Sequence, residues 1–182
     1  MSGKIDWFIL ISVGLVSGLA VVMDLSRGRI YNWLTFPTLI VGVCVSGVFA
    51  GWQGFVHALF GVLAGLLAYG WMYFFGFMGA GDVKLLMALG AWLGGAATLE
   101  TALLSILLGG ALSVLNLFLR GKLLDFCKRV YRAGLSLVVK ELEPSLPVLD
   151  QKNTMPFALP IGLAAVLVLT VHPFQRWGVN LW

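Results

Sequence analysis

Residues 76–85 read Gly-Phe-Met-Gly-Ala-Gly-Asp-Val-Lys-Leu and join two long hydrophobic runs of the chain. A connection between two such runs lies at the edge of a membrane, and an ionised carboxylate within hydrocarbon costs at least ~2.5–3.5 kcal/mol. An acid kept in such a place is a functional-site hypothesis by default, so Asp82 is the first candidate residue. Glycine permits positive φ angles and close backbone approach. We therefore expect Gly79 and Gly81 to shape a bend that holds Asp82 at the mouth of the next helix.

A second acid, Asp24, stands at the end of the first hydrophobic run. Two carboxylates that separate helices bring to the same membrane face can share a proton and activate a water molecule. This pairing is the central hypothesis. Two simpler interpretations remain open: Asp82 as a helix N-cap, and Asp24 as an interfacial acid paired with Arg27 or Arg29.

The composition indicates a membrane protein. Of the 182 residues, 60% are hydrophobic and only 11% are charged, and the mean hydropathy is +0.97. Apolar runs of this kind are typical of chains whose partner is the lipid bilayer. The net charge of +4 is not gathered into basic blocks interleaved with aromatic residues, so we expect no nucleic-acid partner.

Six apolar segments are candidate membrane spans, each of which needs roughly 17–25 residues, and the fourth of them is shorter than this. They predict an all-α polytopic membrane protein with six transmembrane helices in one domain, residues 1–182. The segments are Ile5–Met23, Trp33–Ala50, Phe55–Phe75, Val83–Ala97, Leu99–Leu119 and Met155–His172.

Residues 120–153 form the one long polar interruption. Apolar residues fall on one helical face of this segment and basic residues on the opposite face, which predicts an amphipathic helix lying in the cytoplasmic interface. It serves either as a surface anchor or as a rim that helps to dock a substrate helix.

The basic residues predict the orientation. Ten of the 12 lysines and arginines fall in the connections 24–32, 76–84 and 120–153, and the other two are Lys4 and Arg176. Because cytoplasmic loops carry the excess of Lys and Arg, these three connections are expected in the cytoplasm. Both chain ends are then outside the cytoplasm, and Asp24 and Asp82 share the cytoplasmic edge.

Three pairs of glycines are spaced four residues apart: Gly14 and Gly18, Gly61 and Gly65, Gly90 and Gly94. Small residues at this spacing let helix backbones approach closely in lipid, so we assign all three pairs to helix packing.

The helix ends predict different protonation states for the two acids. The positive end of a helix dipole stabilises an ionised Asp82, whereas Asp24 lies at the negative end of its helix. We therefore expect Asp24 to be the protonated member of the pair and Asp82 the ionised one, although two coupled acids titrate as a unit.

Residues 79–86, Gly-Ala-Gly-Asp-Val-Lys-Leu-Leu, resemble the GxGD signature of the type IV prepilin peptidases. Asp24, followed by Arg-Ile-Tyr-Asn at 29–32, is similar to the first aspartate of that family and the start of its second helix. Residues 156–162, Pro-Phe-Ala-Leu-Pro-Ile-Gly, are similar to the proline-bearing start of its last helix.

This resemblance implies an intramembrane aspartic protease of the bacterial inner membrane, which removes the basic leader of prepilin-like substrates at the cytoplasmic face. Carried over by position, Asp24 and Asp82 are the catalytic pair, and Gly79 and Gly81 shape the loop. Lys84 is then a neighbour that tunes Asp82, or else a basic anchor at the inner membrane face.

One departure from the family bears on cofactors. Members that also methylate the new N-terminus carry an insert with paired Cys-x-x-Cys motifs between the first two helices. Here that connection is residues 24–32 and contains no cysteine. We therefore expect no zinc, no cofactor and no methyltransferase activity, as in the short Tad/Flp-type or archaeal preflagellin peptidases.

Two alternatives remain. One is a GxGD protease of the presenilin kind, since residues 158–160, Ala-Leu-Pro, loosely resemble its proline-alanine-leucine element. The other is a transport component that uses Asp24 and Asp82 as a proton or cation relay. Against transport, no acid is expected along the path through the membrane.

Overall fold

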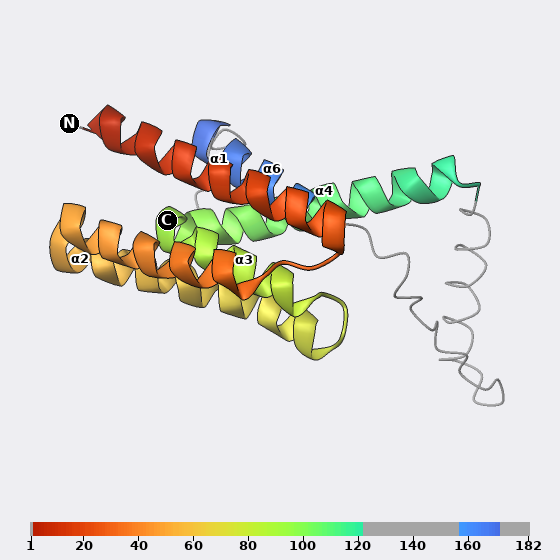
Figure 1. Cartoon of the computed structure of the whole chain (residues 1–182), viewed down its shortest axis with the longest axis horizontal. Helices are drawn as coiled ribbons and strands as arrows, with labels where there is room; N and C mark the ends of the chain where they lie inside the picture. Colours follow the sequence, from red (N-terminus) through yellow and green to blue (C-terminus); the bar gives the residue numbers. More distant parts are fainter. Residues whose placement is uncertain (1, 122–156, 172–182) are drawn as a thin grey trace. The chain divides into compact units, whose positions relative to one another are not determined.

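The computed structural model describes residues 2–121 and 157–171, and all regular structure in these ranges is helical (Figure 1). The predicted all-α class is confirmed. The helices are α1 (Ser2–Arg27), α2 (Asn32–Phe74), α3 (Ala80–Leu93), α4 (Gly95–Leu119) and α6 (Ala158–Val171). The predicted amphipathic helix of residues 120–153 lies outside the described residues, apart from its first two positions.

The chain divides into two compact units, one made of Met1–Leu108 with Pro156–Trp182 and the other of Gly109–Met155. The first unit contains α1, α2, α3, α6 and the first part of α4. The prediction of a single domain stays a prediction.

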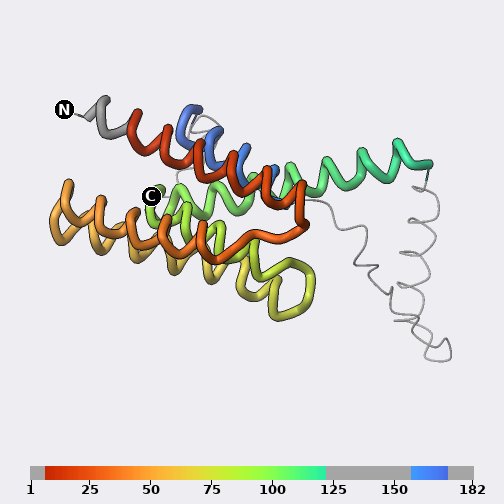
Figure 2. The backbone as a smooth tube through the Cα atoms, viewed as in Figure 1, coloured from red at the N-terminus to blue at the C-terminus, as the bar shows by residue number. Residues whose placement is uncertain are grey.

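Helix α2 is a hairpin of two arms. Its 43 residues would extend ~65 Å if straight, about twice the ~30 Å thickness of a bilayer core. Gly51 interrupts the helix with φ 60° and ψ −145°, and the chain turns back there, as the orange part of the tube shows (Figure 2). The arms, residues 32–50 and 52–74, correspond to the second and third expected spans. The turn is tight, because a side chain at Gly54 would overlap the carbonyl of Ser46.

Three helices of the described residues are long and apolar enough to cross a membrane: Trp7–Arg27, Asn32–Phe74 and Gly95–Leu119. Helices α3 and α6 have 14 residues each, fewer than a span requires. The six-span count therefore stays a prediction. The expected fourth span was placed too late, because Gly94, at φ 78°, separates α3 from α4.

Helix α3 is the buried centre of the first unit. Leu85, Leu86 and Leu89 are fully enclosed, and most of the helix between Val83 and Leu93 is buried. Near its end, Trp92 Nε1 donates a hydrogen bond to the carbonyl of Thr38, 3.1 Å away. Because α3 is packed along most of its length, the position of its first turn, which contains Asp82, is fixed.

Glycines set the register between α3 and the second arm of α2. A side chain at Gly61 would overlap the carbonyl of Gly90, and a side chain at Gly90 would overlap that of Gly61. One turn along, a Cβ at Gly65 would lie 3.0 Å from the carbonyl of Leu86. The predicted close approach of helices at Gly61, Gly65 and Gly90 is confirmed.

The same prediction is wrong for the pair in α1. Among the described residues, a Cβ at Gly14 or Gly18 would meet no atom within 4 Å. Helix α1 instead contacts α6 through Ser17, whose Cβ would be 2.9 Å from a Cβ added at Gly162. Small-residue spacing thus permits close packing without specifying which helix face uses it.

The register generates a test of the fold. Gly61→Ala inserts a methyl group into the backbone contact with Gly90, and overpacking of this kind costs about 1–3 kcal/mol. The matched change Gly14→Ala meets open space and gains helix propensity, so it should leave stability unchanged or raise it. Thermal unfolding of the two variants in detergent measures the difference. A Gly61→Ala variant as stable as Gly14→Ala would contradict the α2–α3 contact.

Candidate active site

Asp82 is the third residue of α3, and Gly79 provides the space for it. Gly79 precedes the helix in an extended conformation, and its carbonyl accepts the N–H groups of Asp82 and Val83 at 3.2 and 3.5 Å. The N–H of Gly79 in turn donates to the Asp82 carboxyl. A Cβ at Gly79 would lie 3.3 Å from Asp82 Oδ2, closer than ordinary contact. The N-cap position therefore belongs to Gly79, and the carboxyl of Asp82 lies against it.

Gly81 lets the connection between α1 and α2 lie directly on the first turn of α3. A Cβ at Gly81 would be 3.2 Å from the Cβ of Ile30 and 3.5 Å from its backbone nitrogen. Helix α1 ends at Gly28, which has φ 61° and whose N–H donates to the carbonyl of Asp24 at 2.8 Å. The connections before α2 and before α3 thus meet at one end of the unit.

Asp24 lies inside the last turn of α1, which continues to Arg27 instead of ending at the acid. Its Oδ2 accepts a hydrogen bond from the backbone N–H of Ala158, 3.1 Å away. Ala158 is the first residue of α6, where backbone N–H groups have no partner within the helix. The N-terminus of α6 therefore fixes the carboxyl of Asp24.

The alternative interpretation, in which Asp24 pairs with Arg27 or Arg29, does not hold for Arg27, because its side chain contacts Tyr31. The guanidinium of Arg27 lies over the ring of Tyr31, 5.6 Å from its centre, and donates to the Tyr31 hydroxyl at 3.5 Å. The side chain thus turns along the surface toward α2, and Asp24 is held by backbone.

The two acids belong to one electrostatic site, since the charge of Asp24 acts on Asp82. Asp82 lies outside the three candidate spans. Burial and, second, the charge of Asp24 raise the pKa of Asp82 to about 7, although the N–H of Gly79 acts in the opposite direction. Partial burial of Asp24 disfavours its ionised form, and the N–H of Ala158 acts in the opposite direction.

These contacts favour Asp82 as the protonated member and Asp24 as the ionised one, the reverse of the expectation from the helix ends. The helix-dipole contribution is typically 0.3–1 kcal/mol near the surface. Burial of a carboxyl beside a second carboxyl changes its protonation free energy by more than that.

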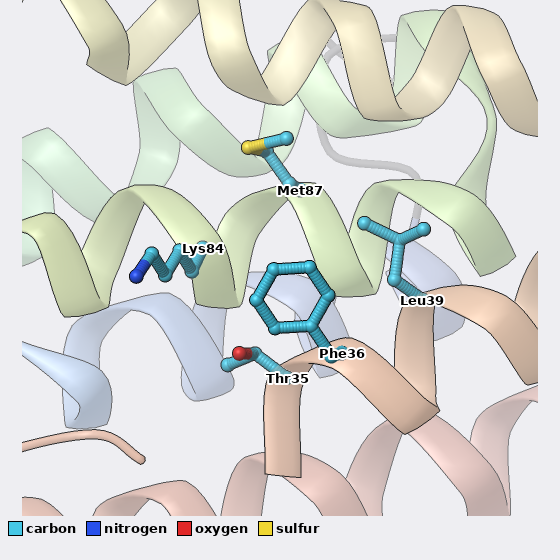
Figure 3. Close-up of a pocket in the computed structure, with 5 residues that line it drawn as sticks. All are labelled: Thr35, Phe36, Leu39, Lys84 and Met87. Carbon is cyan, nitrogen blue, oxygen red and sulfur yellow. The ribbon is translucent and has the colours of Figure 1, made fainter. Parts of the chain in front are cut away.

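Lys84 fastens α3 to the start of α2. Its Nζ donates to Asn32 Oδ1 at 2.9 Å. The stem of Lys84 also lines a pocket, mainly apolar, between the first arm of α2 and α3 (Figure 3). Neither Asp24 nor Asp82 lines this pocket, whose walls are Thr35, Phe36, Leu39, Lys84 and Met87. The position of Lys84 supports an anchoring role more than a direct effect on Asp82.

Three polar residues near the bundle interior were not singled out from the sequence. Tyr69 of α2 and Ser105 of α4 are fully buried and hydrogen-bonded to each other. Glu100 of α4 is also fully enclosed, so the expectation that no acid lies within a membrane segment is wrong. The glycine spacing could have pointed to Tyr69. Gly65 contacts Leu86, and Tyr69 lies one turn after Gly65 while Asp82 lies one turn before Leu86, so Tyr69 is expected opposite Asp82.

In the described part of the chain, no group of three or more His, Cys, Asp or Glu side chains could hold a metal ion. The expectation of chemistry without metal or cofactor stays a prediction.

Comparison with known proteins adds the family. The model of the type IV leader peptidase family matches residues 9–114, more than half of the chain, and this range includes Asp24 and Asp82. The prepilin leader peptidase/N-methyltransferases of two strains of Burkholderia pseudomallei, 1026b and K96243, are each 35% identical over 102 residues. That of Aeromonas hydrophila is 35% identical over 106 residues.

These matches are partial on both sides. They cover 50% of this chain and 32% of the Burkholderia proteins, and 54% of this chain and 36% of the Aeromonas protein. The chain thus aligns with about a third of the length of these curated relatives, and no solved structure matches it. Because the family model spans most of α1 to α4, this chain belongs to the type IV leader peptidase family.

Proposed function

We propose that this chain is an intramembrane aspartic endopeptidase that removes the basic leader of a prepilin-like protein at the cytoplasmic face of the bacterial inner membrane. The observation that carries the proposal is the meeting of Asp24 and Asp82, from two different helices, in one coupled site within the range matched by the family. Such a pair, with one proton between two carboxyls, is the arrangement that aspartic proteolysis requires.

The contacts assign a role to each acid. Asp24, whose carboxyl accepts the N–H of Ala158, is the ionised member of the proposed pair and takes a proton from the attacking water. Asp82, the protonated member, donates to the scissile carbonyl oxygen as the water oxygen bonds to the carbonyl carbon. The C–N bond of the resulting gem-diol then breaks: the proton taken up by Asp24 passes to the departing amine, and one diol hydroxyl returns its proton to Asp82 as the new carboxyl group forms. Gly79 leaves room for the Asp82 carboxyl, and Gly81 lets the connection before α2 approach the same turn, because neither position carries a side chain.

The substrate follows from the position of the acids. A leader rich in Lys and Arg would stay in the cytoplasm, while the apolar segment after it would lie along the apolar helices of the enzyme. The scissile bond must leave the substrate helix, because helical backbone hydrogen bonds occupy the carbonyl that water has to attack.

Family membership favours this proposal over the presenilin-like and transport alternatives, since the family model is that of a leader peptidase. The curated relatives carry the name of an N-methyltransferase as well as of a peptidase. The short connection between α1 and α2, without cysteine, leads us to expect that this chain leaves the new N-terminus unmethylated.

The first test concerns the acids. Co-expression of the chain with a candidate prepilin should yield a shortened, unmethylated pilin, detected by mass spectrometry of the mature N-terminus. Asp24→Asn and Asp82→Asn should each lower the cleavage rate by about 10²–10⁴-fold or more, the usual effect of losing an acid–base group. Asp6→Asn, near the start of the chain, is the matched control. Full cleavage by either active-site variant, with normal accumulation of the protein, would rule out the proposed mechanism.

The second test concerns pH. The pKa of Asp82 is raised to about 7, so Asp82 carries its proton below pH 7 and loses it above. Because the mechanism needs this proton, cleavage in detergent should be sustained below pH 7 and fall about tenfold per unit well above it. A rate that keeps rising between pH 7 and 9 would show that Asp82 acts as an ionised base instead.

A further inference from the structure

The register between α2 and α3 places Tyr69 opposite Asp82. Gly61 meets Gly90, and four residues on in α2 and four back in α3, Gly65 meets Leu86. One more turn in each helix brings the second arm of α2 to Tyr69 and α3 to Asp82. The charge of Asp82 indeed acts on the phenol of Tyr69. A fully buried phenol thus lies beside one of the two candidate catalytic acids.

Hydrogen bonds within α4 determine whether Tyr69 is the donor or the acceptor in its bond with Ser105. Ser105 Oγ lies 2.7 Å from the carbonyl of Thr101 and 2.9 Å from that of Ala102, so its single proton is used on its own helix. The bond between Tyr69 and Ser105 is therefore donated by the phenol. The phenol oxygen is left with lone pairs only, as an acceptor.

The ring of Tyr69 also contacts the segment that holds the other acid, Asp24. It packs edge-on against Phe157, with ring centres 6.5 Å apart. The next residue, Ala158, donates its N–H to Asp24. One side chain therefore packs its ring against the residue before Ala158, the partner of Asp24, and interacts electrostatically with Asp82.

We propose that Tyr69 is a positioning residue for Asp82: its phenol oxygen, left as an acceptor by the bond to Ser105, accepts a hydrogen bond from one bridging water, and this water accepts a hydrogen bond from the protonated carboxyl of Asp82 and so favours the protonated acid. The role of Tyr69 in cleavage rests on the proposed function, whereas its effect on Asp82 does not. Tyr69 touches no reacting atom and acts through the acid.

Two other charged groups lie near Asp82, and one of them, ionised Asp24, is itself an acceptor for its proton. From α1 it faces Asp24, whose charge acts on it directly, and Lys84 on its own helix is bonded to Asn32. The described residues of α6 include no titratable side chain, and the titratable residue of α4 is Glu100.

The experiment measures the protonation of Asp82 directly. Infrared spectra of the detergent-solubilised full chain, from pH 4 to 9, report the C=O stretch of protonated carboxyls, and subtraction of the Asp82→Asn spectrum isolates that residue. The Tyr69→Phe variant keeps the ring against Phe157 and loses the acceptor. Its Asp82 midpoint should fall by about 0.5–1 pH unit relative to the unmodified chain, the size of one hydrogen bond.

Ser105→Ala provides an independent variant. Without Ser105, the phenol proton is free to turn toward Asp82 and stabilise its ionised form, so the midpoint should again fall. Tyr73→Phe, one turn further along α2 at an exposed position, and Thr98→Val, two turns away in α4, are matched controls and should leave it unchanged. If Tyr69→Phe does not accumulate, Ser105→Ala alone carries the test.

Cleavage measurements separate this inference from the proposed function. If the chain cleaves prepilin, the alkaline limb of the pH–rate profile should move with the infrared midpoint while KM stays constant. Midpoints that fall in a chain that cleaves nothing would support the role of Tyr69 and defeat the proposed function. Midpoints that stay within 0.2 unit, or rise, would overturn the inference even if cleavage is observed.

Discussion

The direct backbone contact between α2 and α3 is the constraint on which the rest of the unit depends. Gly61 and Gly90 each occupy space that a side chain on the other would need, and Gly65 repeats the contact one turn along. Helices that approach this closely lock their register, because a shift of one residue would bring side chains into the same space. The register then determines which residues of α2 lie opposite the first turn of α3.

The acids are held by backbone groups more than by side chains. Gly79 donates to Asp82, and the first N–H of α6 donates to Asp24. Both donors are N–H groups at helix starts, which have no partner in their own helix, so the acids and the helix ends satisfy each other. In the described part of the chain, two backbone N–H groups thus position the two carboxyls. That suits chemistry in which one of the two must keep a proton at neutral pH.

Chain reversals at glycine made the compact arrangement possible. A straight helix of 43 residues would be about twice as long as a bilayer core is thick, and Gly51 divides it into two arms of similar length. Gly28 and Gly94 likewise end α1 and α3 at positive φ. At these three places the absence of a Cβ, and not hydrophobicity, decides where a helix stops.

The all-α class and the approximate positions of the described apolar helices followed from the sequence, because hydrophobic runs are local signals. For the same reason the rare acids Asp24 and Asp82 could be proposed from it as candidate site residues. The sequence also indicated Gly61, Gly65 and Gly90 as packing residues. It could not tell that the similar spacing in α1 faces open space, since spacing does not reveal which neighbour a helix has.

Only the tertiary structure decided how the acids are held and which one keeps its proton. Helix ends alone predicted a protonated Asp24, but the N–H that stabilises its charge comes from Ala158, 134 positions later in the chain. Tyr69 and Ser105 are equally distant partners, 36 positions apart. Protonation depends on the donors and charges gathered around a carboxyl in space, and these come from helices that the order of residues does not place together.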